Sequence, residues 1–399
     1  MIFNLCRRIG YRWFNTLLEE IELSKCADPR DRIFAIQSLL HKVDPVVEIQ
    51  PDYEKDIVQL FTEVFVGHSS RNSSLDLIAI CDIAYHDPSF PTWLPNYTLP
   101  KATKRTVRAE ASGRSAAVFE MRGAGILRVG GRTLGCVERS AGHNITADSS
   151  AGDIEQELYQ ISQQLQVSDS QLEAFGSVLC GGAFEHFYSP GHMFSTALAQ
   201  NFPNLKLAVE YLLGFISPSS KKNDSRKSIN DLRFLHFVQK YTVNRKVYKT
   251  SSGTFGFSAS STETGDVAVA LLGLDEVMVL RSTGRATYQV VGESYCHGYM
   301  TSEAFLGPLP NTHRMVWNWN QGIVGLYPTY LDVQSGSSSV EDPRLGDLPE
   351  GWKVIDHEHK DIGHFFENTE TGEQTLMDPR LTPVVLEARG VKIEYFDLV

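Results

Sequence analysis

The chain has 399 residues, of which 42% are hydrophobic, and a formal net charge of −11 at pH 7. A chain of this length can bury at least one large core and has room for two or three domains. The acidic balance argues against nucleic acid or an anionic membrane as the main partner, because both attract a positive surface. The six cysteines are scattered without C-x-x-C spacing, and no apolar run is long enough for a signal peptide or a membrane helix. We therefore expect a cytoplasmic protein with reduced thiols, no metal centre and no cofactor.

A helix start is encoded near the beginning of the chain, at residues 28–32. Asp28 can accept hydrogen bonds from the free N–H groups of the first turn, and Pro29 suits the first helical position, where no donor is needed. Asp31 stands at the capping-box offset. Apolar residues then recur at helical spacing, so the pattern predicts a helix over residues 31–41.

Two arginines in this first turn need partners. Arg30 and Arg32 lie where the helix macrodipole disfavours positive charge. We expect salt bridges to Asp28, Asp31 or the nearby Asp52, and an anion-binding role is the alternative.

The remaining pattern predicts an α+β protein. Residues 1–100 have helical periodicity, and residues 101–310 form a β-rich region with a helical insertion over 152–241. Strands at 117–139 and 245–300 are expected to form a small antiparallel barrel or sandwich. The strands of the second group are predicted at Lys246–Thr250, Thr254–Ser258, Val267–Leu272, Val277–Arg281 and Thr287–Tyr295.

The C-terminal part is predicted to contain a linker, a small module and a tail. We assign residues 311–340 to the linker, 341–383 to the module, and 384–399 to a tail that docks as a helix and a strand. The tetrapeptide Asp-Pro-Arg-Leu occurs at 342–345 and again at 378–381. Because these copies flank the module, we expect both to clamp its ends.

Residues 28–32 resemble a motif of fungal heterokaryon incompatibility (HET domain) proteins, in which Asp-Pro-Arg-Asp follows the effector domain. Further motifs similar to the family's follow in the same order. They are Pro51-Asp52-Tyr53, the turn with Trp93 and Pro95, the strand segment 130–135, Gly265-Asp266, Arg281, and the run 291–300 with Gly292, Glu293, Tyr295, His297, Gly298 and Met300.

This resemblance implies a role in non-self recognition between fungal cells and in regulated cell death. In the family the effector domain precedes the Asp-Pro-Arg-Asp step, and only about 25 residues precede it here. We therefore expect a truncated or divergent member that supplies a regulatory or sensing part. Such a part would act through protein partners and not as an enzyme.

Residues 341–383 are similar to a WW domain, a three-stranded sheet that binds proline-rich peptides. Trp352, Asn368 and Pro379 stand at the framework positions of that family. In the peptide groove, Phe365 replaces the usual Tyr and Leu376 replaces the second Trp. Proline recognition uses two aromatic walls and a hydrogen-bond donor, so this change favours a structural module. An adaptor that binds proline-rich peptides is the alternative.

Two polar clusters leave other functions open. On one strand Glu293, Tyr295 and His297 share a face that Glu303 could join, which would suit a hydrolase or a nucleotide-cleaving enzyme. No nucleophile elbow, phosphate loop or His-Glu-x-x-His motif accompanies them. The second cluster, the histidines at 357, 359 and 364, could hold Zn²⁺ or Cu²⁺. In both cases the structural alternative is a hydrogen-bonded or solvated strand face.

Overall fold

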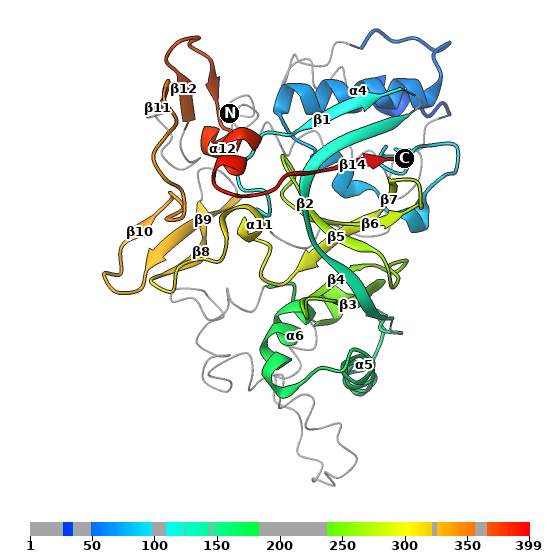
Figure 1. Cartoon of the computed structure of the whole chain (residues 1–399). Helices are drawn as coiled ribbons and strands as arrows, with labels where there is room; N and C mark the ends of the chain where they lie inside the picture. The colour runs from blue at the N-terminus through cyan, green and yellow to red at the C-terminus, as the bar shows by residue number, and fades with distance from the viewer. Residues whose placement is uncertain are drawn as a thin grey trace.

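A computed structural model gives the fold of the chain (Figure 1). The predicted helix over 31–41 is described only for its first turn, residues 31–34, and the three histidines of the second cluster lie outside the described residues. The structure describes residues 27–34, 49–97, 109–123, 125–142, 144–146, 148–182, 238–320, 325–355 and 365–399.

Six strands form a closed ring. The long strand β2, Ile126–Ala141, pairs with β3 near its C-terminal end and with β5 in its middle. The order β2-β3-β4-β7-β6-β5 then returns to β2, and all these pairs are antiparallel. The predicted strands of the 245–300 region agree with the observed ones to within one residue. The observed bounds are β3 Arg245–Thr250, β4 Phe255–Ala259, β5 Val267–Leu271, β6 Val277–Ser282 and β7 Thr287–Cys296.

Two further strands extend this sheet. The edge strand β1, Phe119–Arg122, pairs with the start of β2. The C-terminal strand β14, Glu394–Leu398, pairs antiparallel with β2 and parallel with the start of β7. Figure 1 shows β14 running beside β2. The C-terminal strand β14 therefore lies between β2 and the start of β7, two strands of the ring.

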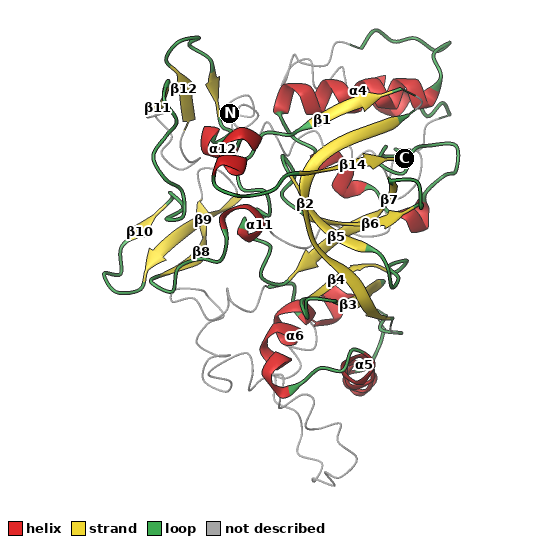
Figure 2. Cartoon of the chain, in the orientation of Figure 1, coloured by secondary structure: helices red, strands yellow, loops and turns green. Residues whose placement is uncertain are grey.

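Helices cover the two ends of the ring (Figure 2). At one end lie α4, Ile57–Asn72, and the short 3-10 helices η1, Asp76–Ile80, and η2, Ile83–Tyr85. At the other end lie α5, Ala151–Gln164, η3, Asp169–Gln171, and α6, Leu172–Leu179. Each group packs on its own set of buried side chains, so the ring is shared by two hydrophobic cores.

The segment assigned to a linker, residues 311–340, contains a three-stranded antiparallel sheet, so that assignment was wrong. Its strands are β8 His313–Asn320, β9 Gly325–Asp332 and β10 Ser338–Ser339. Pro328 in β9 lacks a backbone donor, a feature that argues against a strand. It is accommodated because β10 pairs only with Leu331 and Tyr330, which leaves β9 with one neighbour at Pro328.

A second three-stranded sheet follows, as the sequence predicted for the C-terminal part. Its strands are β11 Trp352–Ile355, β12 Phe365–Asn368 and β13 Gln374–Thr375. The short helices α11 Glu303–Leu306, η4 Pro379–Leu381 and α12 Pro383–Ala388 complete the chain. None of the described helices is long and apolar enough to cross a membrane.

Candidate functional site

The tripeptide Asp-Pro-Arg occurs three times and forms the same local structure each time. In every copy the Asp Oδ1 accepts the backbone N–H of the Arg two residues later at 2.9 Å, because the intervening proline has no N–H to offer. The guanidinium then folds back on the same carboxylate with its Nε and Nη2 atoms. We call this unit the Asp-Pro-Arg clip, and its copies are Asp28–Arg30, Asp342–Arg344 and Asp378–Arg380.

Each clip uses its remaining guanidinium hydrogens to bind a distant segment. Arg30 donates to the carbonyls of residues 53 and 55, and Arg344 donates to those of residues 301 and 307. Arg380 donates to the carbonyl of residue 346 at 3.0 Å and forms an ion pair with Glu341 at 2.7 Å. The clip thus converts a flexible cation into a fixed, bidentate donor.

The first clip joins the two N-terminal motifs. Arg30 pairs with Asp28, one of the expected partners, and lies 5.7 Å from the centre of the Tyr53 ring. The Tyr53 hydroxyl donates to Asp31 at 2.6 Å, and its ring meets Phe34 edge to face. Pro51 and Asp52, the other residues of the second motif, are exposed, and Arg32 is half-buried.

The Trp93 turn connects α4, the ring and the C-terminal strand. Trp93 is fully buried, donates its Nε1–H to the carbonyl of Gly125 at 2.8 Å and packs edge to face on Phe65. The neighbouring Thr92 N–H donates to the carbonyl of Val399 at 3.0 Å, and Pro95 is buried. This motif is therefore a structural joint.

The motifs at Gly265-Asp266 and Arg281 are brought together by strand pairing. Arg281 on β6 binds the buried Asp266 carboxylate bidentately at 2.8 and 3.0 Å. It also donates to the carbonyl of Ser261 at 2.7 Å. Gly265, at φ +97°, makes the turn that precedes β5. These residues fix the loop before β5 to the neighbouring strand.

The acid and the phenol of β7 are engaged by different neighbours. Glu293 forms an ion pair with the buried Arg245, which lies over the Phe257 ring at 4.9 Å. The Tyr295 hydroxyl lies 3.0 Å from the Ser177 hydroxyl of α6. Their shared strand face is thus divided between different contacts.

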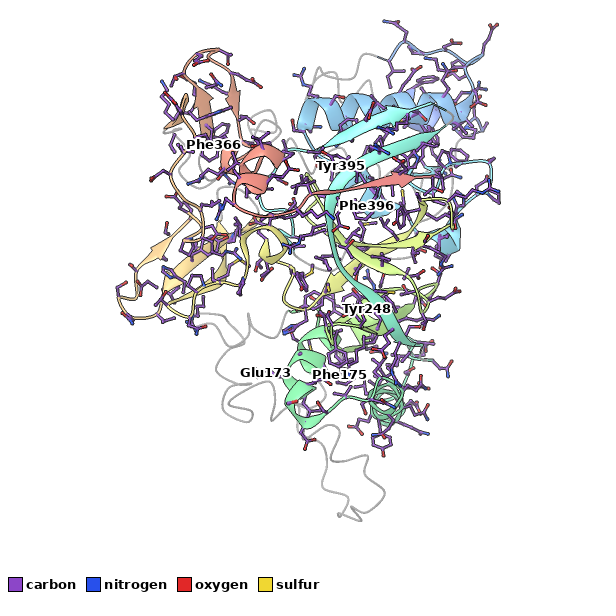
Figure 3. All side chains as sticks on the ribbon, in the orientation of Figure 1. Glu173, Phe175, Tyr248, Phe366, Tyr395 and Phe396 are labelled. Carbon is purple, nitrogen blue, oxygen red and sulfur yellow. The ribbon has the colours of Figure 1, made fainter. Side chains whose placement is uncertain are left out.

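His297, which was expected on the same strand, lies one residue beyond the end of β7 and has a different environment. Burial lowers its pKa, although the carboxylates of Glu303 and Glu173 act in the opposite direction. Its buried Nδ1 atom has no hydrogen-bond partner in the described part of the chain. Figure 3 labels Glu173 on α6, below the ring. In the rest of the family-like motif at residues 291–300, Gly292 and Met300 are buried and Gly298 is exposed.

In the C-terminal sheet, the residues similar to WW positions have mainly structural contacts. Trp352 is half-buried and faces Asn368 across β11 and β12. The Asn368 Oδ1 accepts the N–H groups of residues 370 and 371 and so closes the turn before β13. Pro379 is buried in η4, whereas the groove residues Phe365 and Leu376 are half-buried.

Phe366, a residue that the sequence analysis did not single out, attaches this sheet to the rest of the molecule. Its exposed fraction is 1%, and Arg380 of the third clip lies 5.8 Å from the centre of its ring. Its position on β12 is labelled in Figure 3.

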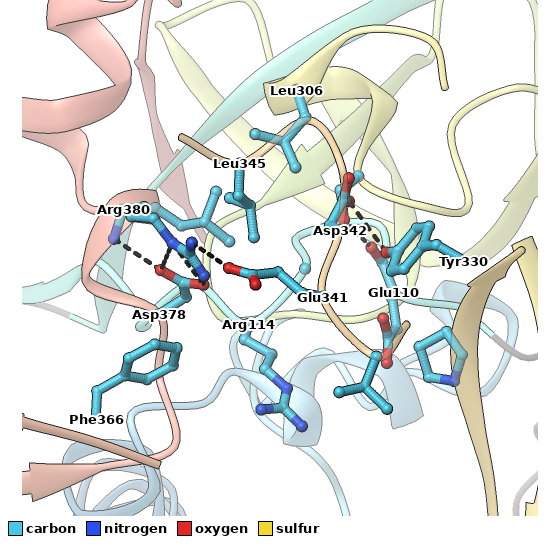
Figure 4. A pocket seen from close by; sticks show the side chains of 15 residues that line it. Glu110, Arg114, Leu306, Tyr330, Glu341, Asp342, Leu345, Phe366, Asp378 and Arg380 are labelled. Atoms are coloured by element: carbon cyan, nitrogen blue, oxygen red, sulfur yellow. Dashed lines mark hydrogen bonds and ion pairs between the residues drawn. The ribbon is translucent and has the colours of Figure 1, made fainter. Parts of the chain in front are cut away.

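A cleft lies at the junction of the ring and the two small sheets (Figure 4). Its volume of about 70 Å³ has room for a few water molecules or part of one side chain. The apolar lining comes from Leu306, Tyr330, Val340, Leu345 and Phe366, and Asp342 of the second clip and Asp378 and Arg380 of the third clip also line the cleft. These residues are distant in the sequence, so no local pattern could have predicted the cleft.

Comparison with known families gives one match. Residues 222–307 match the Het-6 beta-barrel domain, and the described part of this range contains β3 to β7 and α11. No curated protein and no solved structure matches the chain. The match supports a relation to heterokaryon incompatibility proteins and coincides with most of the strand ring.

Proposed function

We propose that this chain is a regulatory, non-enzymatic component of heterokaryon incompatibility in fungal cells, and that it acts through protein contacts. The observation that carries the proposal is the match of residues 222–307 to the Het-6 beta-barrel domain. We infer that the ring of β2 to β7 is this barrel, with β2 supplied by a segment outside the match and β14 added beside it.

The contacts of the family-like residues support a scaffold better than a reaction centre. Asp266 and Arg281 pair with each other, Glu293 pairs with Arg245, and Tyr295 contacts Ser177. Groups that act as general acids or bases need hydrogen-bond reach to a substrate. Charged groups that already satisfy one another contribute to the conformation of the ring instead.

We further propose that the β11–β13 sheet is a WW-like module with a structural role. Its one fully buried aromatic side chain, Phe366, faces the third clip, and its groove residue Leu376 offers neither a flat ring nor a donor. This module would therefore present the cleft and not a proline-binding groove.

The test is a fusion assay in a filamentous fungus that encodes this chain. Deletion of the gene should reduce death of fusion cells between incompatible strains, measured with a dye that enters dead cells. The wild-type chain and Val354→Ala, an exposed substitution on β11, should restore death. Phe257→Ala, which removes a buried ring residue, should not.

Two results would overturn the proposal. Unchanged death after deletion would remove the chain from the incompatibility response. Killing of unfused cells by the chain alone would assign it an effector activity in place of a regulatory one.

A further inference from the structure

The cleft between the ring and the small sheets has room for part of one side chain of a partner. Ligand pockets for small molecules and cofactors usually enclose roughly 300–1,000 Å³. The cleft volume of about 70 Å³ is far below this range. Val340 at its edge has an exposed fraction of 36%, so an incoming chain can reach the apolar walls.

The charge of the surrounding region selects the kind of partner. Residues 341–399 contain 14 acidic and 6 basic residues, a net charge of −8 out of −11 for the whole chain. The cleft lining itself carries four carboxylates, those of Glu110, Glu341, Asp342 and Asp378, against the two guanidinium groups of Arg114 and Arg380.

The two clip cations beside the cleft are withdrawn from the surface, whereas Lys353, Arg389 and Lys392 of the same segment are exposed. Arg344 and Arg380 are each about 95% buried and are held by their clip carboxylates. The Glu341 side chain keeps an exposed fraction of 48% while it pairs with Arg380. Asp347, two residues beyond the cleft residue Leu345, is exposed, whereas Arg114 adds one cation to the lining.

We propose that this cleft binds a basic segment of a partner protein, with the aliphatic stem of a Lys or Arg side chain against the more accessible lining residues Leu306, Val340 and Leu345. Such side chains pack their methylene groups on apolar surface and keep the charged head in water, here beside Glu341. The inference rests on the proposed function, because it names the class of partner through which a regulatory component would act.

Peptide binding to the full chain tests this inference. Three short fluorescent peptides serve as probes, one of alternating Lys and Leu, one of alternating Glu and Leu, and one of alternating Lys and Gly. Fluorescence anisotropy should give saturable binding of the Lys-Leu peptide that weakens as salt is added. The Lys-Gly peptide keeps the Lys side chains but lacks the apolar Leu side chains, so it should bind more weakly, and the Glu-Leu peptide should not bind.

A matched pair of variants separates the cleft from general attraction to an acidic protein. Val340→Lys places a cation at the cleft, whereas Val354→Lys makes the same charge change on β11, outside the cleft lining. Their wild-type exposed fractions are similar, 36% and 39%. Val340→Lys should weaken Lys-Leu binding by about tenfold relative to Val354→Lys.

Equal affinity of the two variants, or equal binding of the Lys-Leu and Glu-Leu peptides, would overturn the inference. Loss of fold is checked by circular dichroism of both variants.

The fusion assay remains an independent measurement. If deletion of the gene lowers cell death but the two variants bind alike, the cleft proposal fails alone. If the variants differ as expected but deletion changes nothing, the proposed function fails and the binding site stands.

Discussion

The ring and the two small C-terminal sheets are held in place by different forces. All five residues of β4 are buried, and most residues of β5 and β6 are also buried, so the ring depends on apolar packing. In β10, β11 and β13 no residue is buried, β12 buries one, and β9 buries Thr329 and Tyr330. Small sheets with so little core are marginal alone. The buried clips supply the attachment that the missing apolar area does not.

This difference predicts that core and clip substitutions destabilise different parts of the protein. The largest effect is expected for Trp93→Ala, which leaves a cavity where α4 meets the ring and should lower the free energy of unfolding by about 3–5 kcal/mol. Urea denaturation followed by far-UV circular dichroism measures the loss. Trp352→Ala on the half-exposed β11 is the matched control and should cost much less. Equal losses of unfolding free energy would contradict the view that apolar packing is concentrated around the ring and not in the small sheets.

A clip substitution should act locally. Arg380→Ala leaves the buried Asp378 carboxylate without its guanidinium, at a cost of about 3 kcal/mol. Hydrogen exchange should speed up in residues 365–381, while the amides of β4 and β5 stay protected. Arg122→Ala, which breaks an exposed ion pair with Glu120, should change neither region. Loss of protection throughout the ring would show that the clips support the whole fold.

The first clip should contribute less than the third. Arg30 and Asp28 keep exposed side-chain fractions of 24% and 29%, against 5% and 5% for Arg380 and Asp378. Because water can solvate Asp28 once its partner is gone, Arg30→Ala should shift the urea midpoint less than Arg380→Ala. A larger shift for Arg30→Ala would show that exposure does not rank these clips.

The smallest expected effect is a pH dependence that comes from His297, just beyond the end of β7. Burial lowers the pKa of His297 below the roughly 6.5 of an unfolded chain. The unfolded state then binds more protons between the two pKa values, so stability is complete above about pH 6.5 and declines as the pH falls toward the folded pKa. His297→Gln should remove this part of the decline when unfolding is measured at several pH values. Parallel pH profiles for the two proteins would refute the prediction.

The strands of the ring could be predicted from the sequence because each has a local pattern. Alternating apolar residues between glycines marked β3 to β7 to within one residue. The β8–β9 hairpin was missed because Pro328 interrupts the pattern, and only the position of β10 explains why it is tolerated. Local sequence patterns thus predicted the regular strands. They did not predict a strand that contains a proline, because only its tertiary neighbours make that proline tolerable.

The site was less predictable, for a physical reason. The recurrence of Asp-Pro-Arg was visible in the sequence, yet the carbonyls that each arginine binds depend on how distant segments approach. Asp266 and Arg281 were both noted, but only the β5–β6 register shows that they pair. Glu293 and Tyr295 lie on β7 and His297 lies just beyond it, and the neighbouring elements give each of them a different environment.

The sharing of β2 among four partners has a consequence for synthesis. Its Arg128 pairs with Asp397, 269 residues later in the chain. At about 5–20 residues per second, a ribosome needs roughly 13–54 s to supply that partner. During this time one edge of β2 is uncovered, which invites pairing with other chains. Production of the protein is therefore expected to depend on chaperones that bind nascent chains, and slower translation should lower its soluble yield.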